Sequence, residues 1–330
     1  MTALAPLLQS YFSERLLDQR CASPQTVAAY RDSFRLLLRF ASARTGKAPS
    51  DLALDHLDAA CIADFLRHLE TDRHNSARTR NARLSAIHSF FRYVATREPA
   101  ELALAQRVLA IPHKRFERAL VTFLSAAEVD ALLAAPDRST WLGRRDHALL
   151  LIAVQTGLRV SELIGLRRDD VELVGTAAHV RCRGKGRKDR CTPLRKQSVV
   201  VLRAWMKEID EAGSAPLFPS RRNNALSRDA VERIVDKHRA RAARTCPSLR
   251  DKTVSPHVLR HTSAMQLLHA SVDCSVIALW LGHESIETTQ MYLHADLSIK
   301  ERALARTAPP RTGARRYRPA DGLLSFLERL

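Results

Sequence analysis

The apolar residues of the first ninety positions recur with a helical period, and this pattern constrains the fold more than any other feature. One stripe contains Leu8, Tyr11, Phe12 and Leu16, and a second covers residues 27–38, as expected for amphipathic helices. Ser23-Pro24 marks the start of the second helix, because a serine side chain caps free N–H groups and proline presets φ. Further helices are expected near residues 59–72 and 77–95. Residues 1–98 are therefore predicted to form a helical domain.

A second domain is predicted after a break in this pattern. Glu98-Pro99 ends the helical run, and the basic segment that follows lacks clear periodicity, so residues 99–120 are interpreted as a linker. Ser125 and Glu128 have the spacing of a capping box that opens a new helix. Helical patterns then dominate residues 121–298, apart from two short extended runs around Gly184 that are typical of a β-hairpin. The expected fold is mainly α, with two domains and a small β-hairpin or sheet in the second.

The charge balance favours a polyanionic partner. The chain has 53 Lys and Arg against 35 Asp and Glu, a formal net charge of +18 and a pI near 10.4, which suits nucleic acid. Charge alone equally fits a basic protein with another role. The six cysteines include no C-x-x-C pair, so neither a zinc knuckle nor a disulfide framework is indicated. No secretory leader or membrane-spanning stretch is evident, and a cytoplasmic protein is expected.

The predicted helix at residues 77–95 is a candidate DNA-binding element. Its apolar side chains can pack inward while Arg78, Arg80, Asn81, Arg83 and His88 stay outside. Arginine and asparagine read base edges bidentately and also bind phosphates. A basic face that contacts only solvent is the alternative, because charged helix faces are common.

Five short elements follow one another in the second domain. These are Thr156-Gly-Leu-Arg159, Gly184-Lys185-Gly186, His257-Val-Leu-Arg260, Leu281-Gly-His283 and Tyr292. In this order they resemble the tyrosine recombinase family of phage integrases and Xer-type recombinases. Each element alone would occur often by chance, whereas the ordered set at these spacings is specific. The resemblance covers nearly the whole chain and implies an enzyme that cuts and rejoins DNA, built as a two-domain clamp around the duplex.

Elementary chemistry explains why such a site needs these residue types. A phosphodiester gains negative charge as a nucleophile adds, so fixed cations stabilise the transition state preferentially. Arg159 and Arg260 suit this task, because a guanidinium is always charged and binds two phosphate oxygens at once. His257 lies three residues before Arg260 and shares its helix face.

The resemblance assigns roles to the remaining positions. It implies that Tyr292 attacks the phosphate to form a 3′-phosphotyrosine, that His257 accepts the tyrosine proton and that His283 binds a phosphate oxygen. Lys185 is the expected general acid for the leaving 5′ oxygen. Glu162 matches an acidic position that supports the site, although an internal salt bridge explains it equally well. Arg183, Arg187 and Lys188 are expected to contact DNA from the hairpin.

Alternative chemistries are less favoured. His257 and His261 are spaced for a zinc site, but Val258 replaces the glutamate of H-E-x-x-H and no third ligand stands out, so His261 is predicted to have a packing or scaffolding role. Gly184-Lys185 is not a Walker loop, because Gly186 stands where Ser or Thr is required. No metal or cofactor is expected. Tyr317 is the one rival nucleophile, in a basic context typical of a DNA-contacting tail.

The biological role is left open by the sequence. Integration, excision or transposition of a mobile element is the favoured reading. Chromosome dimer resolution by a Xer-type recombinase, a type IB topoisomerase and a non-catalytic DNA-binding regulator are the alternatives. The resemblance implies a homo-tetramer on two sites in duplex DNA, alone or with a related recombinase, acting at the nucleoid. Residues 299–330 form a tail whose apolar end, residues 323–330, docks either onto a neighbouring protomer or back onto its own chain.

Overall fold

The protein divides into two compact units, Met1–Arg118 and Ala119–Leu330. The computed structural model describes residues 2–116, 121–173, 178–183, 189–209, 212–283, 287–290 and 292, and each unit is described by itself. No helix within these ranges combines the length and the apolar character that crossing a membrane would require.

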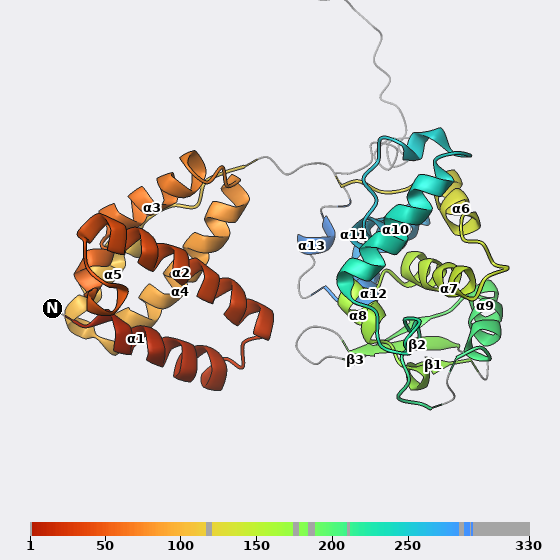
Figure 1. Ribbon diagram of the computed structural model, residues 1–330, viewed down its shortest axis with the longest axis horizontal. Coiled ribbons are helices and arrows are strands. Elements are labelled where there is room, and N and C mark those ends of the chain that lie inside the picture. Colours follow the sequence, from red (N-terminus) through yellow and green to blue (C-terminus); the bar gives the residue numbers. More distant parts are fainter. Residues whose placement is uncertain are drawn as a thin grey trace, which may run out of the picture. The chain divides into compact units, whose positions relative to one another are not determined.

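The first unit is helical, as the sequence predicts (Figure 1). Its elements are α1 (Leu4–Ser10), a π-helical segment (Tyr11–Gln19), α2 (Pro24–Thr45), 3₁₀ turns at Pro49–Asp51, Leu54–Leu57 and Pro99–Glu101, α3 (Ala59–Thr71), α4 (Ala77–Arg97) and α5 (Leu102–Leu109). Ser23 caps α2 as expected, accepting a hydrogen bond from the Thr26 N–H at 3.2 Å. Residues from all five helices pack into one apolar core.

The linker prediction is wrong for its first half. Residues 102–109 form α5, and Leu104, Ala105 and Val108 are buried in the core of the first unit. Burial of each large aliphatic side chain contributes roughly 1.5–3 kcal/mol, which holds this short helix against α4. An eight-residue helix is too short to be stable alone or to give a clear period, so tertiary packing decides its conformation.

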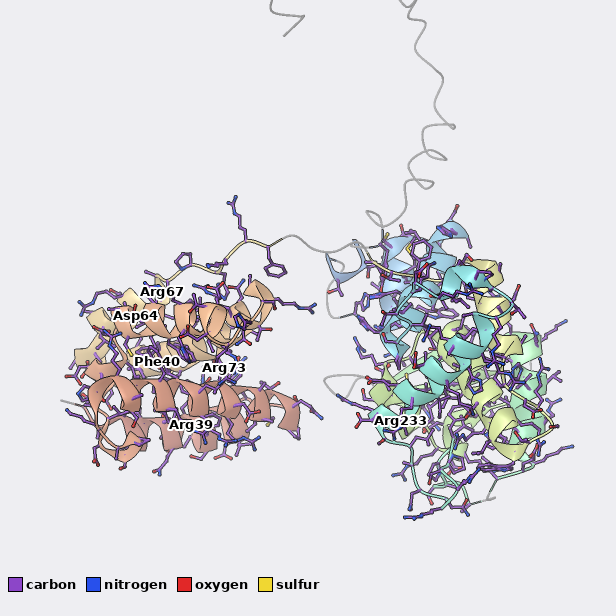
Figure 2. All side chains as sticks on the ribbon, turned by 45° about the horizontal axis from the view of Figure 1, so that its top comes forward. Arg39, Phe40, Asp64, Arg67, Arg73 and Arg233 are labelled. Carbon is purple, nitrogen blue, oxygen red and sulfur yellow. The ribbon has the colours of Figure 1, made fainter. Side chains whose placement is uncertain are left out.

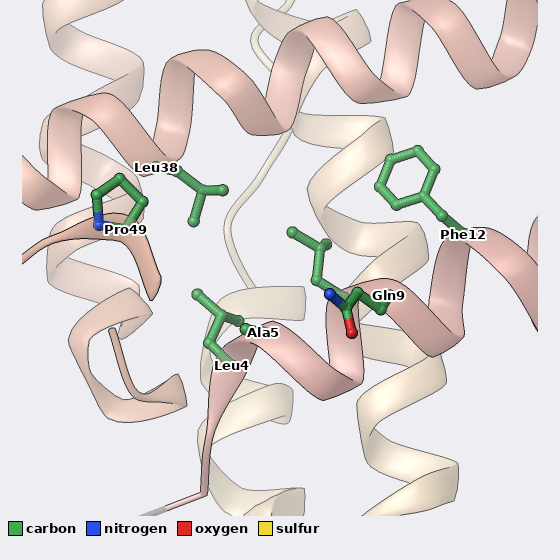
Figure 3. A pocket seen from close by; sticks show the side chains of 7 residues that line it. Leu4, Ala5, Gln9, Phe12, Leu38 and Pro49 are labelled. Atoms are coloured by element: carbon green, nitrogen blue, oxygen red, sulfur yellow. The ribbon is translucent and has the colours of Figure 1, made fainter. Parts of the chain in front are cut away.

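A shallow apolar pocket of about 310 Å³ lies where α1 approaches α2 (Figure 3). The ring of Phe12, from the π-helical segment that follows α1, and the side chain of Leu38, from α2, border it. The complete lining consists of Leu4, Ala5, Leu8, Gln9, Phe12, Leu38 and Pro49.

The second unit combines helices with one small antiparallel sheet, which agrees with the predicted fold class. Its helices are α6 (Ala126–Ala134), α7 (Trp141–Thr156), α8 (Val160–Gly165), α9 (Lys196–Met206), α10 (Arg228–Ala242), α11 (Pro256–His269), α12 (Cys274–Leu281) and α13 (Glu287–Gln290), with 3₁₀ turns at Arg168–Asp170 and Pro247–Leu249. The sheet has the order β1 (Val171–Glu172), β2 (His179–Arg183), β3 (Asp189–Pro193), and lies to one side of the helices (Figure 1).

Short sequence motifs determine where some of these elements begin. The predicted capping box opens α6: the Ser125 N–H donates to Glu128 Oε2 at 2.8 Å, and the Glu128 N–H donates to Ser125 Oγ at 3.3 Å. The predicted hairpin is β2 and β3, in a register that pairs Val180 with Thr192. Helix α11 packs against α7 and α12, so that sequence-distant residues come together at the ends of these helices.

Candidate functional site

Two glycines at helix ends fix the positions of the residues that follow them. Gly157 ends α7 with φ 63°, and Gly282 ends α12 with φ 64°, a left-handed conformation that glycine adopts without steric cost. A Cβ on Gly157 would lie 2.6 Å from Leu281 Cδ2, so the close approach of α7 and α12 also requires glycine. Arg159 and His283 follow these turns and are directed to the same region.

Two guanidinium groups are held by backbone carbonyls at the ends of α7 and α12. Arg260 donates to the carbonyls of Gly157 and Leu281, both at 2.7 Å, and Arg159 donates to the carbonyl of Gly282 at 2.8 Å. Burial, together with the charge of Arg159, lowers the pKa of Arg260 to about 10, so the Arg260 guanidinium stays charged at neutral pH. The Arg159 side chain is 32% exposed, which leaves this end of the cluster open to a ligand.

A buried carboxylate links these arginines to the sheet. Glu162 accepts hydrogen bonds from the Arg159 N–H at 2.7 Å and from Arg159 Nη1 at 2.9 Å. Arg190 of β3 binds both carboxylate oxygens, at 2.9 and 2.8 Å. Burial raises the pKa of Glu162, but the hydrogen bonds from Arg190 and the Arg159 backbone outweigh it and hold the pKa below its ordinary value. Glu162 is therefore an anion that orients Arg159 and ties it to the hairpin.

Tyr292 is buried beside this cluster, with a side chain only 1% exposed. Its hydroxyl lies 2.9 Å from Nδ1 of His261, and its ring is stacked against that of His283 at a centroid distance of 6.4 Å. Burial raises the pKa of Tyr292, whereas the charges of Arg260 and Arg159 act in the opposite direction. The positive charges of both guanidinium groups therefore stabilise the ionised form of the phenol.

His283 is held in a fixed orientation. Its Nδ1 lies 2.7 Å from the hydroxyl of Thr289, which is fully buried. Burial, and then the charges of Arg260 and Arg159, lower the pKa of His283 to about 4, so the ring is neutral at neutral pH. A neutral imidazole anchored in this way can donate one hydrogen bond to an anion.

The structure thus brings together five of the residues predicted from the sequence: Arg159, Glu162, Arg260, His283 and Tyr292. His257 lies on the first turn of α11 and is exposed, with its ring 4.2 Å from that of His261. Lys185, Arg187 and Lys188 lie outside the described residues, as does Tyr317. Arg183 ends β2. Such a cluster can bind an anion between two guanidinium groups beside a phenol hydroxyl.

Two residues of the site were not predicted to take part. Arg190 was not singled out, because its role depends on strand register, and His261 was assigned to packing or scaffolding. The spacing of His257 and His261 does place both on one helix face, which is the sequence signal for the second histidine. Within the described ranges, no group of three or more His, Cys, Asp or Glu side chains is arranged to hold a metal ion.

The structure corrects the prediction that Arg80, Asn81 and His88 face outward from α4. Arg80 and Asn81 are buried, at 7% and 9% exposure, and His88 at 4%. Arg80 donates to the carbonyl of Pro112 at 3.0 Å, while Asn81 donates to the carbonyl of Lys114 at 2.7 Å and accepts from its N–H at 3.0 Å. The segment after α5 returns along α4, and its backbone groups need hydrogen-bond partners.

Other arginines of the first unit remain at the surface. Arg78, at the start of α4, is exposed, whereas Arg83 is half-buried and burial lowers its pKa. Arg39 on α2, Arg67 on α3 and Arg73 after α3 are also exposed (Figure 2). Exposed arginines are therefore present on this unit, but of the α4 residues predicted to face outward only Arg78 is exposed.

Comparison with known proteins adds independent information. Residues 122–298 match the model of the phage integrase family, and residues 9–98 match that of the phage integrase N-terminal SAM-like domain. A "Putative integrase/recombinase y4rC" of Sinorhizobium fredii is 57% identical over 328 residues, which cover 99% of this chain and 98% of the relative. "Tyrosine recombinase XerC" of Pelobacter propionicus is 35% identical over 305 residues, covering 89% and 93%.

Solved structures share the fold. The chain is similar to the XerH site-specific recombinase bound to a palindromic difH substrate, with a TM-score of 0.65, 23% identity and coverage of 87% and 81%. It is also similar to the Tn1549 transposon integrase in complex with a circular intermediate DNA, with a TM-score of 0.69, 15% identity and coverage of 93% and 100%.

Proposed function

The chain belongs to the phage integrase family of tyrosine recombinases, which cut and rejoin DNA, and on this premise we propose that Tyr292 is its nucleophile. The observation that carries the proposal is the placement of one buried phenol beside two converging guanidinium groups. A phenol is a weak nucleophile at neutral pH, and nearby positive charge favours its ionisation as it attacks.

The scissile phosphate binds to Arg159, Arg260 and His283. The two arginines are oriented by backbone carbonyls on one side, and their remaining N–H groups are suited to non-bridging oxygens. Glu162 orients Arg159 through two hydrogen bonds. Because these groups are held before DNA arrives, they stabilise the transition state without reorganisation.

Cleavage exchanges one ester bond for another. The Tyr292 oxygen forms a bond to phosphorus as the bond from phosphorus to the 5′ oxygen breaks, and Lys185 protonates the leaving oxygen. One of the two histidines on α11 takes the phenol proton. The resulting 3′-phosphotyrosine retains the energy of the cut bond, so a 5′ hydroxyl from a partner strand can rejoin it without metal or ATP.

Covalent trapping tests the nucleophile. A nicked duplex carrying the protein's own site, located by footprinting, is incubated with the full chain and analysed after denaturation. Wild type and Tyr317→Phe are expected to form a DNA adduct, and Tyr292→Phe is expected to form none. An adduct with Tyr292→Phe would show that another residue attacks, and the absence of an adduct with wild type would favour a non-catalytic regulator.

The biological role is proposed to be the movement of a mobile element. Support comes from two S. fredii relatives, both named putative integrase/recombinase, at 57% and 45% identity, which exceed the 35% of the XerC relative. Amplification of circular junctions from cells that express the protein checks this role. Chromosome dimers in cells that lack the protein, without such junctions, would instead favour Xer-type dimer resolution.

The assembly is proposed to be a tetramer on two sites at the nucleoid. Solved relatives are described as bound to DNA substrates, and the net charge of +18 suits the same partner. In this proposal residues 1–98 and 121–298 each contact the duplex, and the tail from residue 299 joins neighbouring protomers. Light scattering of the protein with two-site DNA, with and without residues 299–330, tests the stoichiometry and the role of the tail.

A further inference from the structure

Two histidines one turn apart on α11 have different environments. His261 is 8% exposed, and its Nδ1 lies 2.9 Å from the Tyr292 hydroxyl. His257 is exposed at the start of the helix, next to His261. We propose that His261 is a catalytic residue that accepts the Tyr292 proton when the phenol attacks DNA. This inference rests on the proposed function, in which Tyr292 is the nucleophile, and revises the sequence-based assignment of the acceptor to His257.

The direction of the hydrogen bond between His261 and Tyr292 depends on the tautomer of the imidazole. Burial lowers the pKa of His261 to about 4, with smaller contributions from the charges of His257, Arg260 and His283, so the ring is neutral at neutral pH. A neutral imidazole has one N–H and one lone-pair nitrogen. Burial also raises the pKa of Tyr292, so its hydroxyl keeps its proton and is able to donate. With the ring proton on Nε2, the phenol O–H points at the Nδ1 lone pair.

The helix around His261 is well fixed. Its neighbour Thr262 is fully buried, donates to the carbonyl of Val258 at 2.8 Å and accepts from the N–H of Leu124 at 3.0 Å. On the other side, Arg260 is bonded to two carbonyls. The backbone that carries His261 is therefore held in place, and its Nδ1 lies within hydrogen-bonding distance of the phenol, which is the geometric requirement for a general base.

Phosphate binding improves His261 as a proton acceptor. Its pKa is low in part because of nearby positive charge, and a phosphodiester that enters beside Arg159 and Arg260 offsets that charge. As the Tyr292 oxygen bonds to phosphorus and the bond to the 5′ oxygen breaks, the phenol proton moves to Nδ1 of His261. On rejoining, the imidazolium returns the proton to the tyrosine oxygen.

Single-turnover cleavage as a function of pH tests the proposal, with the full chain and the nicked duplex described above. His261→Asn keeps an acceptor oxygen near the position of Nδ1 but cannot take a proton. It is expected to lose about 10²–10⁴-fold in the rate of adduct formation at pH 7.5. Its rate should then rise about tenfold per pH unit as hydroxide ionises the phenol, and added imidazole should restore part of the activity of His261→Ala. His257→Asn is the matched control, with a smaller loss and an unchanged pH profile.

Two results would overturn the inference. His261→Asn could cleave within about threefold of wild type with the same pH profile, or it could cleave faster, which would mean that the hydrogen bond only restrains a resting tyrosine. Tyr292→Phe is measured in the same experiment. If that variant forms an adduct, both proposals are wrong. If adduct formation requires Tyr292 but is unaffected by substitution of His261, only the present inference is wrong. Unfolding curves of each variant check that the fold is retained.

Discussion

Replacement of Arg190 by methionine tests how strongly the buried carboxylate ties the sheet to the site. The Arg190 side chain is 12% exposed and that of Glu162 is 4% exposed, so the pair is shielded from water. Removal of one partner of a buried pair costs about 3–5 kcal/mol. Glu162 keeps its two bonds from Arg159, so we expect the lower end, about 3 kcal/mol.

Tryptophan emission offers a selective assay. The chain has three tryptophans, Trp141, Trp205 and Trp280, and all of them lie in the second unit. Denaturant unfolding followed by emission therefore reports the unit that contains Arg190. A loss of about 3 kcal/mol corresponds to a fall of about 6–12 °C in Tm for a unit of this size.

The effect should depend on pH in a defined direction. The pKa of Glu162 is held below its ordinary value in the folded protein, so the pair contributes stability above the unfolded pKa of about 4.3 and loses it as pH falls. The difference between wild type and Arg190→Met should therefore be full at pH 7 and shrink as pH falls below about 4, through the depressed pKa of Glu162 in the folded protein.

Arg239→Met is the matched control in the same unit. Its partner Asp236 is 68% exposed, and an exposed pair of this kind is expected to contribute less than about 1 kcal/mol. Two results would refute this prediction: Arg190→Met could cost no more than Arg239→Met at pH 7, or its cost could be the same at about pH 3 as at pH 7.

Two further predictions concern the fold around the site and the end of the first unit. Asn81→Leu removes two hydrogen bonds to the backbone of Lys114, in the segment after α5. The free energy needed to detach this segment from α4 should fall by about 1–2 kcal/mol, and trypsin should cleave the segment about 5–30-fold faster. An unchanged cleavage rate would contradict this prediction. Gly282→Ala places a Cβ 2.5 Å from Arg190 Nη1 at a φ of 64° and should slow adduct formation at least about tenfold while costing more than about 2 kcal/mol. Gly46→Ala is the control, because Gly46 has a φ of 70° but open space around its Cα. It should lower the free energy of unfolding by only about 1 kcal/mol, the cost of a left-handed backbone at alanine.

The sequence predicted features that depend on local chemistry. Ser23-Pro24 and the Ser125 capping box start helices where expected, because capping is decided within one turn of the chain. The fold class follows from such signals together with the apolar period.

The sequence could not predict contacts between distant segments. Arg80 and Asn81 are the residue types that bind DNA, yet a chain segment more than thirty residues away occupies them. Helix α5 exists because the first unit offers it an apolar surface. Neither outcome is encoded in a local pattern, because each depends on where the chain returns.

In the candidate site, too, some features follow from the sequence and others only from tertiary contacts. The order of arginine, histidine and tyrosine residues along the chain, through its resemblance to a known family, predicted a set of site residues, of which Arg159, Arg260, His283 and Tyr292 lie together in the structure. Tertiary structure decided which histidine lies against the phenol and that Arg190 shares Glu162 with Arg159. A difference of one helical turn, or of one strand position, changes a neighbour in space without altering the motif, so only the packing of α11 and β3 determines these partners.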